Sequence, residues 1–291
     1  SEGVYAPQNV ADVLLVRKLG ISFSNIQLDA SDGWGQDVIG SLYYSGVNVE
    51  RNYSEAVKWF RKSAEQGNPA GEHSLAVCYD SGKGVEKNVD EAVKWAQKSA
   101  AQDFIGGKVS LGALYYDGHG VEKNYEKALD LFKQGVKQCV PSAENRLGFC
   151  YYEGKCVEKN YEEAFKWFRK AAKNGYDYGC LNVGVAYYSE YGVDRDFGEA
   201  IKWYHKAIEL GNVEAIRCLG DCYYNGFGVE KDCKEAVKLY RKAADNGDIV
   251  AKVSLGNCCY WGAGVEQNYD EAVKIYREAS EEEENTQAKF R

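Results

Sequence analysis

The chain has 291 residues, and its 36 Lys and Arg against 44 Asp and Glu give a formal net charge of −8. This acidic balance argues against a nucleic-acid partner, because phosphate binding requires a basic face. The longest uncharged apolar run, Val13 to Val16, is far too short for a transmembrane segment.

The first predicted element is a short amphipathic helix from Ala11 to Leu19, which Gly20 stops and a second apolar stretch follows. Residues 1–30 do not hold the periodic pattern of the remaining chain. The first unit of a repeat array exposes an apolar side unless something covers it. We therefore expect residues 1–30 to form an N-terminal cap region, with an independent binding arm as the alternative.

Residues 31–284 repeat with a fixed period of 36, and no insertion breaks the count. Such a period indicates a solenoid, in which each unit contacts its neighbours. The predicted units are approximately 31–66, 67–102, 103–138, 139–174, 175–210, 211–246 and 247–282. The glutamates at 281–284 are expected to form a solvated helix end, and residues 285–291 a C-terminal tail.

Each unit begins with a predicted helix, which we call helix A. In the sixth unit, Leu219, Cys222 and Tyr223 fall at i, i+3 and i+4 on one helix face. Gly226 and Gly228 then supply a helix stop and a turn. Helix A also carries a recurring glycine, which we expect to let a neighbouring helix approach closely, at Gly148, Gly184, Gly220 and Gly256.

A second predicted helix, helix B, follows the turn. In the sixth unit Asp232 is the expected N-cap, and Glu235 is expected to reach back to the cap, as in a capping box. The third unit departs, with Lys127 at the position of the glutamate. The buried face of this helix is predicted to consist of Ala236, Leu239, Tyr240 and Ala243.

The repeated pattern LG-x-x-YY-x-G-x-GVE-K-[ND]-Y-x-EA-x-KW-x-x-KAA-x-x-G resembles the Sel-1-like repeat family, a relative of the tetratricopeptide repeats. The resemblance implies an all-α fold, a right-handed α/α superhelix (solenoid) of about seven 36-residue helix-turn-helix repeats. It also implies an adaptor or scaffold whose helices A line the concave side. Asn48, Cys156 and Glu190 replace loop glycines and leave the geometry of those loops open.

The ten cysteines are expected to be free thiols. Four of them share the buried phase of helix A and are predicted to act as small core residues: Cys78, Cys150, Cys222 and Cys258. Cysteine-rich members of the family join helices by disulfides between cysteines at the repeat positions of Ala244 and Lys252. In this chain only Cys180 occupies either of these positions. The resemblance therefore implies that this disulfide framework is missing.

No constellation for catalysis stands out. The histidines, His73, His119 and His205, occupy unrelated phases, and no phosphate loop or metal-ligand spacing is visible. We expect no catalytic residue, no cofactor and no metal. The family resemblance also brings a hydrolase of penicillin-binding type as a further alternative, although it is the cysteine-stapled members that suggest it.

The outward phases of helix A carry an unusual number of aromatic and amide side chains. Exposed aromatic residues mark interaction surfaces. The candidate partner-binding residues are Tyr44, Tyr116, Asn145, Phe149, Tyr152, Tyr188, Arg217, Asp221, Tyr224, Asn225, Asn257, Tyr260 and Trp261. The alternative is that each tyrosine leans sideways onto the next unit and serves only in packing.

Together these features predict a non-enzymatic scaffold that binds a peptide or protein segment in its concave groove. A structural assembly subunit that uses its ends or its convex face is the alternative. A monomer without nucleic-acid partners is expected. Because the sequence contains no methionine, we expect a soluble protein that is either cytoplasmic or exported with its signal peptide removed.

Overall fold

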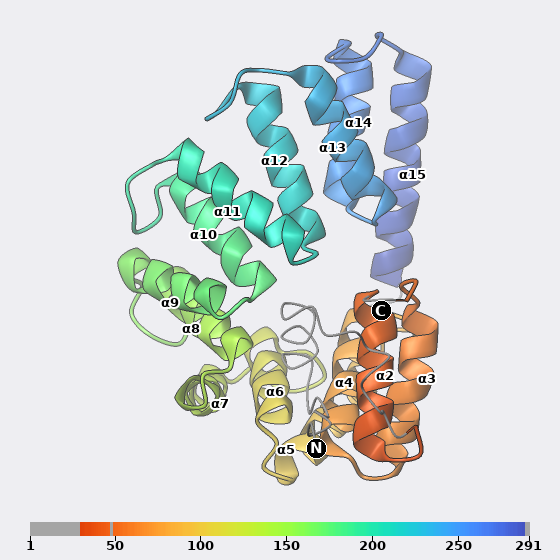
Figure 1. Ribbon diagram of the computed structural model, residues 1–291, viewed down its shortest axis with the longest axis vertical. Helices are drawn as coiled ribbons and strands as arrows, with labels where there is room; N and C mark the ends of the chain where they lie inside the picture. Colours follow the sequence, from red (N-terminus) through yellow and green to blue (C-terminus); the bar gives the residue numbers. More distant parts are fainter. Residues whose placement is uncertain (1–29, 47–48, 289–291) are drawn as a thin grey trace, which may run out of the picture. The chain divides into compact units, whose positions relative to one another are not determined.

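The computed structural model describes residues 30–46 and 49–288, with side chains up to Glu282 (Figure 1). The predicted N-terminal cap at 1–30 lies outside the described residues except for Ala30, and so do residues 289–291 of the predicted tail. Asn48 is also outside them.

The described chain consists of fourteen helices in seven antiparallel pairs. The first helices of the pairs, helices A, are α2 (Gly33–Ser45), α4 (Pro69–Ser81), α6 (Ile105–Asp117), α8 (Pro141–Glu153), α10 (Asp177–Ser189), α12 (Val213–Asn225) and α14 (Ile249–Trp261). The second helices, helices B, are α3 (Tyr53–Glu65), α5 (Val89–Ala101), α7 (Tyr125–Lys137), α9 (Tyr161–Lys173), α11 (Phe197–Glu209), α13 (Cys233–Asp245) and α15 (Tyr269–Ala288). The predicted all-α fold of seven helix pairs is confirmed.

The helices form two compact units, and the division falls between Val140 and Pro141. Within each unit a helix A packs on the helix B of its own repeat, and that helix B packs on the next helix A. Helices A of consecutive repeats also contact each other, as α2 does with α4 and α8 with α10. In the first unit, where α4 also contacts α6, helices A therefore form a continuous row.

The predicted caps start the helices B. The Asn52 side chain accepts from the backbone N–H of Glu55 at 3.0 Å, and the equivalent bond recurs in every repeat. Lys127 also makes it, because the donor is its backbone amide and not its side chain.

The glutamate of the predicted capping box does not reach back, however. Glu55 pairs with Lys58 at 2.9 Å, while the N–H of Asn52 donates to the carbonyl of Tyr43 in helix A at 2.9 Å. The turn between the helices is short enough to bring that carbonyl to the cap, so the glutamate is free for the exposed lysine.

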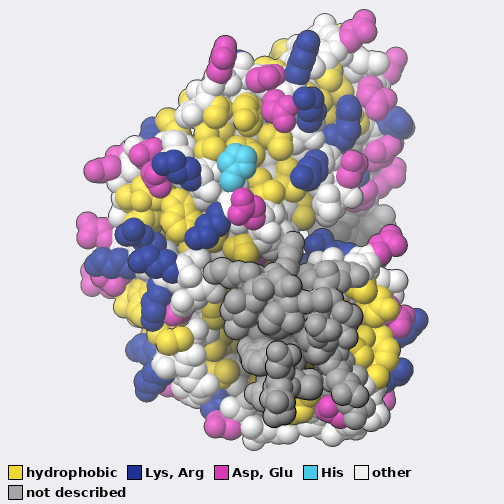
Figure 2. All heavy atoms as spheres, in the orientation of Figure 1, with side chains coloured by type: hydrophobic (Ala, Val, Ile, Leu, Met, Phe, Trp, Pro, Cys, Tyr) yellow, Lys and Arg dark blue, Asp and Glu magenta, His cyan; other side chains and the backbone are white. Residues whose placement is uncertain are grey.

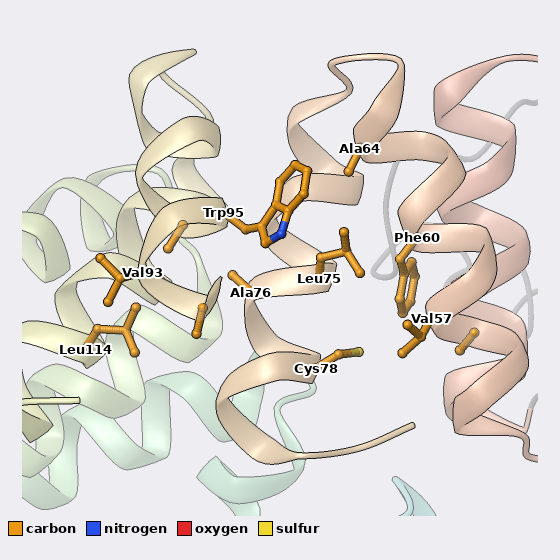
Figure 3. Packing of buried hydrophobic residues seen from close by; sticks show 12 residues of the cluster. Val57, Phe60, Ala64, Leu75, Ala76, Cys78, Val93, Trp95 and Leu114 are labelled. Carbon is orange, nitrogen blue, oxygen red and sulfur yellow. The ribbon is translucent and has the colours of Figure 1, made fainter. Parts of the chain in front are cut away.

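An aromatic ring of helix B lies against a glycine of helix A in six repeats. In the fifth repeat, a Cβ built on Gly184 would come within 2.6 Å of the Tyr204 ring, which explains the predicted need for a small residue. The second repeat lacks both groups and pairs Ala76 with Ala96, both buried. Beside them Trp95 enters the core (Figure 3).

The buried face of helix B differs from the prediction at one phase. Ala236, Tyr240 and Ala243 are buried as predicted, whereas Leu239 is only half-buried. Val237 lies in the core instead, because its side chain meets the helix pair of the seventh repeat.

One of the residues that replace a loop glycine adopts the left-handed backbone conformation of that glycine, and another does not. Glu190 ends α10 with φ +64°, the left-handed conformation that Gly226 and Gly262 adopt at the same phase. Cys156, which replaces a second loop glycine, does not take a positive φ.

Candidate functional site

A row of hydrogen bonds joins consecutive helices A, and we call it the helix-A ladder. Its rungs occupy the same two phases of the repeat. They are Ser74 Oγ to Asp37 Oδ1 at 2.8 Å, Ser110 Oγ with His73 Nδ1 at 2.9 Å, and Asn182 Nδ2 to Asn145 Oδ1 at 2.8 Å. Asn145, a candidate partner-binding residue, is thus 5% exposed and already engaged with the next repeat.

Aromatic rings join the repeats at the other end of helix A. Tyr152 of α8 contacts Tyr161, the first residue of α9, with 5.4 Å between ring centroids. Tyr191, in the loop of the next repeat, contacts both rings at 5.2 and 5.3 Å. We call such a set an aromatic joint.

A second aromatic joint follows one repeat later. There Tyr188 contacts Phe197 at 5.4 Å and Phe227 at 5.9 Å, and the two phenylalanine rings stack at 4.8 Å. Each joint contains a helix-A ring, the first residue of helix B and a loop residue of the next repeat.

A small apolar pocket lies beside the first joint, with a volume of about 120 Å³. Helices α8, α9 and α10 and the loop after α10 form its walls. Its lining residues are Phe149, Tyr152, Tyr161, Ala164, Phe165, Phe168, Asn182, Val185, Ala186 and Tyr191. Two candidate residues, Phe149 and Tyr152, are therefore brought together with one rung of the helix-A ladder.

A wider depression of about 460 Å³ lies over the turn that follows α4. It is lined by Tyr79 and residues 85–88. None of the candidate partner-binding residues contributes to it. The pocket in the second unit is thus the one that agrees with the sequence-based candidates.

The remaining candidate tyrosines take part in similar contacts. The sequence places them on the outward side of helix A, yet Tyr116 is only 6% exposed, and Tyr44 and Tyr224 are half-buried. Tyr44 and Tyr116 meet the first residue of their own helix B at 5.1 and 5.5 Å. These two ring partners lie in the same repeat.

Arg217 and Asp221 belong to an ion-pair network. Arg217 lies 3.1 Å from Glu214, 3.4 Å from Asp221 and 3.4 Å from Asp248. The Tyr240 hydroxyl donates to Asp221 at 2.7 Å. Burial is the largest influence on the pKa of Asp221 and raises it, while the Tyr240 bond and Arg217 oppose the rise.

The last two repeats expose the remaining candidates. Asn225 is exposed and donates to the Asp221 carbonyl, and Asn257 accepts from the Tyr276 hydroxyl at 2.6 Å. Tyr260 and Trp261 contact each other at 4.8 Å and are among the most exposed aromatic residues described. Figure 2 shows how apolar side chains reach the surface in patches between charged ones on one face of the molecule.

The hydroxyl of Tyr152 at the pocket is neutral. Burial and a hydrogen bond with Tyr191 raise the pKa of Tyr152 to about 12, so its hydroxyl stays protonated at neutral pH. A neutral, partly apolar surface is suited to packing against apolar groups.

The structure describes all ten cysteines as free thiols. The four at the helix-A core phase are fully buried, as predicted. In the part of the chain that is described, no three His, Cys, Asp or Glu side chains gather as metal ligands. Nor does any helix there combine the length and the apolar character that a membrane span requires.

A tandem array of antiparallel helix pairs, joined by the helix-A ladder and the aromatic joints, defines an α-solenoid repeat protein. The Sel1 repeat model matches residues 36–68, 69–104, 109–138, 141–176, 177–212, 213–248 and 249–283. The chain therefore belongs to the Sel1 repeat family, whose members generally mediate protein–protein interactions.

Solved structures with the same fold support this assignment. A Sel1 repeat protein from Oxalobacter formigenes is 31% identical, with a TM-score of 0.61, over 84% of this chain and 96% of that one. The protective antigen c5321 of uropathogenic Escherichia coli, which displays an SLR fold, is 28% identical with a TM-score of 0.53. That match covers 94% of this chain and 62% of the antigen.

A short match links the chain to a curated protein, the putative sel1-like repeat-containing protein L18 of Acanthamoeba polyphaga mimivirus. The two are 39% identical over 49 residues, which is 16% of this chain. The match spans only 8% of the viral protein, so it bears on the repeat alone.

Of the ten lining residues, only Phe149 and Tyr152 were selected from the sequence; the unselected ones that carry a polar group are Tyr161, Asn182 and Tyr191. Tyr161 could have been found, because an aromatic residue recurs at the start of helix B at Tyr53, Tyr125, Tyr161, Phe197 and Tyr269. Asn182 and Tyr191 vary between repeats, and only the fold shows that they face Asn145 and Tyr152.

Proposed function

We propose that this protein is a non-enzymatic adaptor that captures a peptide segment on the helix-A side of its second unit. The pocket between the fourth and fifth repeats takes one apolar side chain of that segment. The amide group of Asn182 bonds the peptide backbone. The observation that carries this proposal is the ring-lined pocket beside Asn182.

The size of the pocket suits a single side chain. An apolar cavity of about 150 Å³ in another protein binds benzene, so a pocket of about 120 Å³ holds an aliphatic or small aromatic group. Binding energy at interfaces is concentrated in such desolvated pockets with aromatic walls. The pocket therefore provides affinity for an apolar anchor.

Asn182 supplies the polar group that an extended peptide needs. Its side chain is half-buried at the pocket wall, and the bond to Asn145 fixes its orientation. An amide offers both a donor and an acceptor to a peptide main chain. Because the net charge is −8, electrostatic attraction favours the encounter with segments that carry basic residues.

A hydrolase that uses Ser110 and His73 is a second candidate function, and it has weaker support than the adaptor. A serine hydrolase needs a histidine that accepts the serine proton and an acid that orients it. Burial lowers the pKa of His73 to about 4, which makes it a weak base. The same two phases hold Asp37 with Ser74 and Asn145 with Asn182, so the pair is one rung of the ladder.

Selection from a displayed library of random peptides tests the adaptor proposal. We expect enriched peptides to share an apolar anchor. The variant Val185→Phe fills the pocket with a side chain that Phe149 already places at this phase. It should weaken the binding of selected peptides at least about 10-fold.

The matched control is Val250→Phe, an exposed position on α14 away from the pocket. Its peptide affinity should stay within about twofold of the wild type. Thermal melts of both variants show that the fold is retained. Failure to enrich any peptide, or equal affinity in the Val185→Phe variant, rejects the proposal.

A further inference from the structure

The last repeat exposes an apolar face whose equivalent positions are buried or half-buried in the earlier repeats. We call it the terminal face, and it consists of Tyr260, Tyr269, Val273 and Tyr276 on α14 and α15. Val273 is 53% exposed, whereas its counterparts Val57, Val93 and Val237 are 4%, 8% and 4% exposed. Tyr260 and Tyr269 are 40% and 55% exposed.

The preceding junctions show what covers this phase. Val237 lies in one core cluster with Leu255, Cys258 and Cys259 of the following helix A. The loop of the following repeat covers the ring pair, as Phe227 covers Tyr188 and Phe197. The terminal face therefore has the shape and chemistry of a surface that receives another helical element.

The described chain does not turn back to cover the face itself. At the phase where earlier repeats reverse direction, Gly67, Gly175, Gly211 and Gly247 have positive φ, and Asp103 and Cys139 do as well. The seventh repeat has Glu283 there, and α15 continues as a helix to Ala288. Within the described residues, the terminal face has no covering repeat.

We propose that a second copy of this chain covers the terminal face, so that two α15 helices pack antiparallel about a twofold axis near Val273. Such an isologous contact requires a self-complementary surface. Asp270 and Arg277 flank Val273 at three residues before and four after it, and both are exposed. Antiparallel pairing sets Arg277 of one copy beside Asp270 of the second copy.

A head-to-tail arrangement is the competing one. In it the terminal face would meet α2, the helix A of the first repeat, at the positions equivalent to Leu255, Cys258 and Cys259, which are Ile39, Leu42 and Tyr43. All three are half-buried. Such a contact would grow as a filament, whereas the twofold contact closes as a dimer, so species larger than a dimer would overturn the proposal.

Sedimentation velocity of the full chain between about 1 and 100 µM tests the proposal. We expect a concentration-dependent dimer. Val273→Lys should raise its dissociation constant at least about 10-fold, because two lysines would meet at the twofold axis. Val250→Lys is the matched control, since Val250 is 57% exposed outside the terminal face. It should dimerise like the wild type.

A charge reversal distinguishes the twofold contact from a general apolar association. Arg277→Glu should weaken the dimer, and the double variant Asp270→Arg with Arg277→Glu should restore it. A monomer at all concentrations would overturn the proposal and leave the face to a helix of another protein. A dimer that ignores Val273→Lys, with melts unchanged, overturns it as well. Peptide binding at the pocket is read out separately through Val185→Phe.

Discussion

The Nδ1 atom of His119 lies 2.9 Å from Oδ1 of Asp80, at the two phases where later repeats bring aromatic rings together. The equivalent pairs are Tyr152 with Tyr191 and Tyr188 with Phe227, at 5.2 and 5.9 Å between centroids. The same gap between repeats is thus closed by a polar contact in the first unit and by rings in the second. The two kinds of junction should respond differently to salt.

Double-mutant cycles can measure that difference. For Tyr152→Ala with Tyr191→Ala we expect a coupling of about 0.5 to 1.5 kcal/mol that does not change with salt. For Asp80→Ala with His119→Ala we expect less than about 1 kcal/mol, because both side chains are more than a third exposed. This second coupling should shrink further in about 1 M salt. Chemical denaturation of the four variants in each cycle provides the measurement, and an Asp80–His119 coupling that is indifferent to salt would contradict the polar assignment.

The close approach of Gly184 to Tyr204 predicts a large penalty for a single methyl group. Gly184→Ala should lower the free energy of unfolding by about 1 to 3 kcal/mol, because its Cβ would press into the ring. Ala76→Gly, at the same phase of the second repeat, faces Ala96 and should cost only about 1 kcal/mol through helix propensity. Urea denaturation of both variants checks the contrast, and equal losses would mean that the ring does not impose the glycine.

The buried Asp37 predicts a pH-dependent stability. Burial raises its pKa from 3.8 to about 6, against the opposing bond from Ser74. Because the folded state holds the proton more tightly, this contribution to stability is full below pH 3.8 and is lost as the pH rises through 6. A rise of this size corresponds to about 3 kcal/mol.

Asp37→Asn removes the titration and keeps an acceptor for Ser74. At pH 8 this variant should be more stable than the wild type by up to about 3 kcal/mol, and the difference should vanish near pH 4. Melting curves of both proteins from pH 4 to 8 provide the comparison. The other ionisable groups are common to both chains, so a difference that stays constant with pH would rule out Asp37 as its source.

The left-handed Glu190 predicts a stabilising substitution. Glu190→Gly should raise the stability by about 1 kcal/mol, because glycine adopts this φ without a steric penalty. The ion pair that it removes, Arg195 at 3.3 Å, is exposed and worth little. Glu190→Gln is the control, since it keeps the strained backbone and should show no gain in a thermal melt. A gain in both variants would point to the lost charge instead.

Much of the fold follows from the 36-residue period alone. The glycine that ends helix A, the Asn or Asp that caps helix B and the buried alanines recur often enough to define seven helix pairs. The cap at Asn124 holds even with Lys127, because a backbone amide makes the bond. The prediction that Glu55 reaches back was wrong, since the Tyr43 carbonyl takes the amide of Asn52.

The candidate site was less accessible to sequence. Tyr152 and Phe149 stood out because aromatic side chains at outward phases are unusual. Nothing in the spacing shows that Asn145 faces Asn182, or that Tyr191 closes over Tyr152, because these contacts link one repeat to the next. The exposure of Tyr260 depends equally on the absence of a covering loop within the described residues, which periodicity cannot reveal.

The loop residues of the joints bear on how the number of repeats could change in the gene. Loss of residues 175–210 in frame would place Phe227 opposite Tyr152, a ring against a ring. Loss of residues 67–102 would place His119 opposite Tyr44, again two rings. After either deletion the array is one repeat shorter and still has a ring facing a ring at the new joint, so no gap opens there.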